Sequence, residues 1–192
     1  MLLNQRDMLN QLELVNIGMI EEFKQEYLPM SAEDLNRKPS EKSWSILETF
    51  EHIRKANRTY VEQFDRILNE PAKKDEAPEL FKPAFFGLKF YQMMRPKGDK
   101  IPNKMQTMKK MRPDTELGIL SEFDKDKVLA DMLIELERFN TYFQNAQGRN
   151  LKKYKISAAV PLVSFNLGDA LRFMGAHTER HMLQAKNVKN SL

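Results

Sequence analysis

Three histidines are the residues of this chain whose type and spacing could do chemistry. His177 and His181 stand four apart, so on a helix their imidazoles project from one face, about 6 Å apart along the axis. His52 lies far upstream and can add a third nitrogen if its own helix packs beside theirs. Three neutral imidazoles suit zinc, nickel, copper or ferrous iron and leave coordination positions for water or a substrate. These three residues therefore permit an open divalent-metal site on His52, His177 and His181, for which zinc or nickel ranks ahead of iron or copper.

Other residue types limit what this site can be. An isolated pair of histidines four apart also occurs on helix surfaces and in cores that bind no metal. Thr178, not a glutamate, follows His177, which disfavours a protease of the H-E-x-x-H type. The chain has no cysteine, so disulfides, thiolate ligands and a cysteine nucleophile are excluded. A thiol could take part only as a substrate.

Four long segments with apolar residues every three or four positions must hold these histidines. A serine and a glutamate with capping-box spacing, Ser45 and Glu48, mark the start of the second segment, and the histidine pair continues the apolar stripe of the fourth. The segments run from Leu2 to about Tyr27, from Trp44 or Ser45 to Asn69, from Ser121 or Asp124 to Gly148, and from Asn166 past His181. With little strand signal, they predict an all-α four-helix bundle.

A proline-rich insertion, about residues 71–120, separates the second and third segments. Six of the nine prolines lie between Pro71 and Pro113, which excludes one continuous helix. The insertion also has an apolar aromatic cluster, predicted to contain a short helix: Phe81, Phe85, Phe86, Leu88, Phe90, Tyr91, Met93 and Met94. From Lys82 to Arg112 there are nine basic residues and one acid, Asp99. The insertion therefore carries the positive excess of a chain whose net charge is +4.

The length and composition indicate one domain, residues 1–192. A chain that is 41% hydrophobic and 30% charged must build its core from amphipathic elements. No run approaches the roughly 18–20 apolar residues needed to span a bilayer, and Met1–Asp7 lacks the features of a signal peptide. We therefore expect a cytoplasmic protein without a membrane span.

Two motifs together resemble the DinB/YfiT-like superfamily of four-helix metalloproteins. They are Trp44-Ser45-Ile46-Leu47-Glu48 leading to His52-Ile53, and His177-Thr178-Glu179-Arg180-His181 followed by Gln184. The resemblance implies a bundle of up-down-down-up type, with a metal held by His52, His177 and His181. The long proline-rich insertion departs from the simplest members of the superfamily.

The resemblance also implies a reaction class, because characterised members include S-transferases that use low-molecular-weight thiols, an isomerase, and suggested hydrolases. The preferred interpretation is a metal-dependent thiol S-transferase in which the metal activates a small thiol. A metal-dependent hydrolase that activates water is the near alternative. In both cases the reacting group is a water or a thiol at the three-histidine site, and no catalytic side chain is assigned.

The basic aromatic insertion allows a different class of function. Clustered lysines and arginines attract polyanions, so a non-enzymatic binding protein remains an alternative, although no nucleic-acid-binding fold is recognisable and nucleic acid is not the favoured partner. We also expect a homodimer. The apolar aromatic part of the insertion could form its interface, which is compatible with an enzyme. Near the site, Glu48 could orient the His52 ring, and Asn57 and Tyr60 could line the pocket. Trp44 is expected to pack as a core lid beside the start of the second segment.

Overall fold

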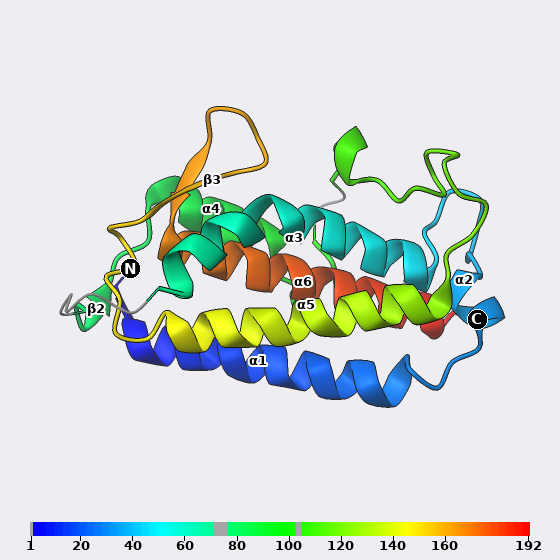
Figure 1. Cartoon of the computed structure of the whole chain (residues 1–192), viewed down its shortest axis with the longest axis horizontal. Helices are drawn as coiled ribbons and strands as arrows, with labels where there is room; N and C mark the ends of the chain where they lie inside the picture. Colours follow the sequence, from blue (N-terminus) through cyan, green and yellow to red (C-terminus); the bar gives the residue numbers. More distant parts are fainter. Residues whose placement is uncertain (1, 71–76, 103–104) are drawn as a thin grey trace.

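Four long helices lie side by side in the computed structural model, which describes residues 2–70, 77–102 and 105–192 (Figure 1). They are α1 (Gln5–Glu26), α3 (Ile46–Leu68), α5 (Lys125–Asn145) and α6 (Leu167–Lys189). Shorter helical elements are α2 (Ala32–Asn36), α4 (Phe85–Met94) and the 3-10 turn η1 (Lys109–Met111). Helix α1 packs against α5, and α3 packs against both α5 and α6. The predicted all-α four-helix bundle is confirmed.

Side-chain caps begin α3, α5 and α6, as the sequence indicates. The Ser45 hydroxyl accepts the N–H of Glu48 at 3.1 Å, and the Glu48 carboxylate accepts the N–H of Ser45 at 2.9 Å, which completes the predicted capping box of α3. Asp124 caps α5 and Asn166 caps α6 in the same way. Helix α1 begins at Gln5, later than predicted, because the preceding strand β1 (Leu3–Asn4) pairs with β2 (Leu80–Phe81).

Helices α3 and α5 run in the same direction, while α1 and α6 run the opposite way (Figure 1). This is the up-down-down-up arrangement that the resemblance implies. A helix of 23 residues such as α3 is about 34 Å long, so the chain must return over that distance before α5 can start. The predicted insertion is this crossover, although its residues 71–76 and 103–104 lie outside the described residues.

Helix α4 confirms the predicted short helix in the insertion and attaches the crossover to α6. The Asp169 carboxylate accepts the N–H of Ala84, one residue before α4, at 2.8 Å. The guanidinium of Arg172 lies 4.1 Å from the centre of the Tyr91 ring. Gly87 lies so close to the Asp169 carboxyl that a methyl group there would overlap it. Helix α4 is therefore held at a fixed place on α6.

Two buried clusters form the core. One gathers around Phe64, Tyr142 and Met174, and the other around Phe23, Phe50 and Met182. Along α3 and α6 the histidines lie between the members of these clusters. The apolar stripes that build the core thus also carry the histidines into the bundle.

Some elements were not predicted. The connector after α1 contains α2, and the segment between Gly148 and Phe165, expected to be a loop, contains the antiparallel strands β3 (Lys155–Ser157) and β4 (Ser164–Asn166). Their signals are short and lack periodicity over several turns. Within the described residues, no helix has the length and apolar character needed to cross a membrane.

Candidate metal centre

The structure brings the three predicted histidines together. His52 lies in the second turn of α3, and His177 and His181 lie in the middle of α6, which packs against α3. One ring nitrogen from each can be chosen so that all three atoms lie within 4.8 Å of one another. All three side chains are buried, with 4–8% of each residue exposed. The predicted cluster therefore exists inside the bundle.

Hydrogen bonds fix the tautomers of two of the rings. Nδ1 of His52 lies 2.8 Å from the carbonyl oxygen of Met111, which can only accept, so this nitrogen donates and carries the proton. Nδ1 of His181 lies 3.0 Å from Oε1 of Gln184 and donates in the same way. In a neutral imidazole the other nitrogen, Nε2, then carries a free lone pair. Both rings are thus prepared as ligands.

The third ring has an unsatisfied polar atom. Nδ1 of His177 is buried and has no hydrogen-bond partner among the described residues. A buried polar atom without a partner is costly in a folded protein, and a bound ion or water commonly satisfies such an atom. The orphaned nitrogen therefore agrees with a site that takes up an ion.

Burial keeps all three imidazoles neutral. Desolvation lowers the pKa of His177 to about 3, with smaller contributions from His52 and Arg180. Burial is also the main reason that the pKa of His181 lies well below 6.5 and that the pKa of His52 is lowered. A metal ligand must be the neutral imidazole, so protons compete little for these nitrogens at neutral pH.

The residues fit a divalent metal. A tetrahedral ion with nitrogens at about 2.0–2.1 Å holds those nitrogens about 3.3 Å apart, a distance that lies inside the 4.8 Å within which one nitrogen from each ring is found. Ligating histidines commonly donate their other N–H to a carbonyl or amide oxygen, as His52 and His181 do. The cluster could hold a divalent metal, and three nitrogens alone do not select which one.

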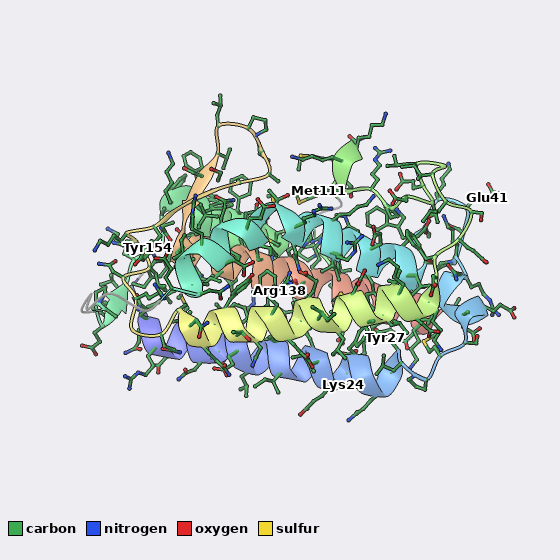
Figure 2. The ribbon with its side chains drawn as sticks, in the orientation of Figure 1. Lys24, Tyr27, Glu41, Met111, Arg138 and Tyr154 are labelled. Atoms are coloured by element: carbon green, nitrogen blue, oxygen red, sulfur yellow. The ribbon has the colours of Figure 1, made fainter. Side chains whose placement is uncertain are left out.

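The crossover supplies part of the site, a contribution that sequence reasoning missed. The carbonyl of Met111 in η1 orients His52, and Figure 2 shows Met111 beside α3. Lys55 of α3 holds the following segment by donating to the carbonyl of Arg112 at 2.9 Å and to Asp114 at 2.5 Å. A backbone carbonyl has no residue signature, so no sequence pattern could identify this partner.

Three other residues have expected roles that the structure tests. Glu48 does not orient His52 by a hydrogen bond, because its carboxylate is bound to Ser45, Lys38 and Thr115. Asn57 donates to Glu135 at 3.4 Å and does not line the cavity beside the histidines. Trp44 lies next to the site, with its ring centre 4.9 Å from that of His52.

An apolar cavity of about 250 Å³ opens beside His52 and His177. Its walls are formed by helices α3, α4 and α6, by the β3–β4 hairpin, and by the crossover segment 105–108 with Met111. Tyr60 lines it, as predicted. None of the described residues that line this cavity is an aspartate, glutamate, lysine or arginine.

A second pocket, of about 610 Å³, lies on the side of His181 and Trp44. Its described lining residues include the cations Lys42 and Arg180 and no carboxylate. Of the residues that the structure describes, Met94, Met105 and Thr107 line both spaces. The histidine cluster thus lies between an apolar cavity and a larger polar pocket.

Comparison with known families agrees with this geometry. The profile of the DinB superfamily matches residues 25–185, most of the chain and all three histidines. The chain belongs to the DinB superfamily. No curated protein and no solved structure matches it significantly. Membership and the three-histidine cluster together fit a metal-binding DinB-like protein.

Proposed function

We propose that His52, His177 and His181 bind a divalent metal, zinc or nickel ahead of iron or copper, and that this DinB-like protein is a metal-dependent S-transferase. In this proposal a low-molecular-weight thiol is the nucleophile and a second organic molecule is the electrophile. The absence of cysteine is compatible with this, because the thiol must come from outside the chain.

The observation that carries the proposal is the pair of unlike spaces that meet at the histidines. His52 and His177 line the apolar cavity, whereas His181 lines the polar pocket. A transfer reaction needs room for two organic molecules, whereas hydrolysis needs room for one molecule and water. Lys42 and Arg180 favour an anionic, hydrophilic thiol in the polar pocket.

The chemistry balances without an oxidant or reductant. A divalent metal at the three imidazoles would supply positive charge that lowers the pKa of a thiol. The thiol loses its proton to bulk water, its sulfur forms a bond to an electrophilic carbon, and the leaving group departs with the electron pair of the bond that breaks. The histidines stay neutral, and the surrounding apolar side chains limit the access of water.

The first experiment tests the metal. Untagged protein from metal-replete medium should contain roughly one divalent ion per chain by elemental analysis, and His177→Ala should lose it. Asn187→Ala, which changes the rim of the polar pocket and no ligand, is the matched control and should retain the metal. A metal-free wild type would refute the metal site.

The second experiment tests the reaction. Cysteine, glutathione and other small thiols are offered with chlorodinitrobenzene, and chloride release is followed. Turnover should require both thiol and metal and should be lost in His177→Ala. Ester hydrolysis that needs the metal but no thiol would favour the hydrolase alternative instead. The predicted homodimer and cytoplasmic location belong to the same proposal, and light scattering tests the former.

A further inference from the structure

We infer that the cavity beside His52 and His177 binds compact, uncharged, apolar molecules of varied shape, and that these are the electrophilic substrates of the site. The inference rests on the proposed function for its second half. Its first half, the class of ligand, depends only on the cavity and its lining.

The lining excludes charge. Among the described lining residues, the polar side chains besides the two histidines are those of Tyr60, Gln106 and Thr107. The Tyr60 hydroxyl already accepts the N–H of Ala159 at 3.4 Å. With no lysine, arginine or carboxylate among its described lining residues, the cavity offers a charged ligand no counter-ion. Transfer of an unpaired charge from water into such a place is strongly unfavourable. The polar pocket beside His181 includes two cations among its described lining residues and suits the other reactant.

The volume limits the size of the ligand. An apolar cavity of about 150 Å³ takes up benzene, and drug-sized ligands need about 300 Å³ or more. A cavity of about 250 Å³ lies between these values. It therefore fits a substituted ring or a short branched chain. Met105 and Met108 are 45% and 36% exposed, which places partly open, movable side chains at the cavity.

The lining also favours varied shapes. Five methionines line the cavity: Met94, Met105, Met108, Met111 and Met174. This is five of the twelve methionines in the chain. Methionine is unbranched and polarisable, and surfaces rich in it adapt to ligands of different outline. Among them, Phe90 packs edge-to-face on Phe165 and Phe173, which holds these three rings against one another. A lining that mixes adaptable methionines with packed rings indicates selection by polarity and size, with little selection by shape.

The methionines provide the test. Protein labelled with ¹³C at the methionine methyl groups is titrated with toluene, butylbenzene and benzoate, and the methyl shifts are followed by NMR. Toluene and butylbenzene should shift the five cavity methionines, while Met19 and Met132, which are buried elsewhere in the core, should not move. Benzoate should bind at least a hundredfold more weakly than toluene. Equal affinity for toluene and benzoate, or shifts spread evenly over all methionines, would overturn the inference.

The titration is made on metal-free protein, because a carboxylate could bind a metal ion directly, and the neutral ligands are then repeated on the metal-loaded protein. Toluene binding by a chain that never takes up metal would reject the proposed function and leave the class of ligand standing. Ala158→Phe, which places a ring in the cavity from the hairpin, should weaken toluene at least tenfold. Ala130→Phe on the exposed face of α5 is the matched control and should bind as the wild type does.

Discussion

Acid should destabilise the metal-free protein through His177. Burial lowers the pKa of this imidazole from 6.5 to about 3 in the folded protein. Between these two values the unfolded chain binds more protons than the folded one, so the free energy of unfolding falls as the pH falls. The contribution is intact above pH 6.5 and is lost progressively until the pH reaches about 3.

The size of this loss in the free energy of unfolding follows from the linkage between proton binding and folding. Each pH unit below 6.5 costs about 1.4 kcal/mol for a group that stays neutral in the fold, so His177 alone costs about 2 kcal/mol at pH 5. Burial lowers the pKa of His52 and His181 too, so both add to the loss. The free energy of unfolding of an ordinary domain is about 5–15 kcal/mol, so a loss of this size is easy to measure.

The change in the free energy of unfolding can be measured by urea unfolding at pH 7.5 and at pH 5. The unfolding is followed by far-UV circular dichroism with a chelator present. His177→Gln has no titratable group at this position and should lose about 2 kcal/mol less than the wild type over this range. Burial raises the pKa of Glu135 and Asp169, which acts in the opposite direction, but both proteins share these groups and the comparison cancels them. The same loss in wild type and variant would refute the reasoning.

Two further substitutions test how the site and the crossover are held. Gln184→Leu removes the oxygen that accepts the N–H of His181, so metal affinity in a competition titration should fall about 10–100-fold while the melting temperature changes little; unchanged affinity would contradict this. Gly87→Ala would push a methyl group into the Asp169 carboxyl and should lower the free energy of unfolding by about 1–3 kcal/mol. Its control, Gly18→Ala, meets nothing within 4 Å in the middle of α1 and should raise stability by about 0.5–1 kcal/mol. Equal effects of the two glycine substitutions would show that the contact with Asp169 does not matter.

The parts of the fold that could be predicted have local causes. The capping box of Ser45 and Glu48 involves residues three apart, and the apolar stripes repeat over several turns, so both are visible in the sequence. The stripe of the fourth segment also placed His177 and His181 toward the interior, whereas His52 was expected to join them only if the second segment packed beside the fourth.

What could not be predicted depends on contacts between distant segments. Glu48 and His52 are four apart on one helix, which made a hydrogen bond between them plausible, yet Thr115 and Lys38 come from elsewhere and bind that carboxylate. The acceptor for His52 is a backbone carbonyl 59 positions later in the chain. The cavity is bounded by the crossover and the hairpin, whose positions follow from packing and have no periodic pattern in the sequence.

Met111 takes part in both the metal centre and the cavity, because its carbonyl orients His52 while the residue lines the apolar space. A molecule that fixes this segment of the crossover therefore also fixes the His52 ring in the orientation that presents Nε2. By thermodynamic reciprocity, whatever factor a cavity ligand contributes to metal affinity, the metal contributes to the affinity for that ligand. Met111 is therefore the residue through which occupancy of the cavity would be felt at the metal centre.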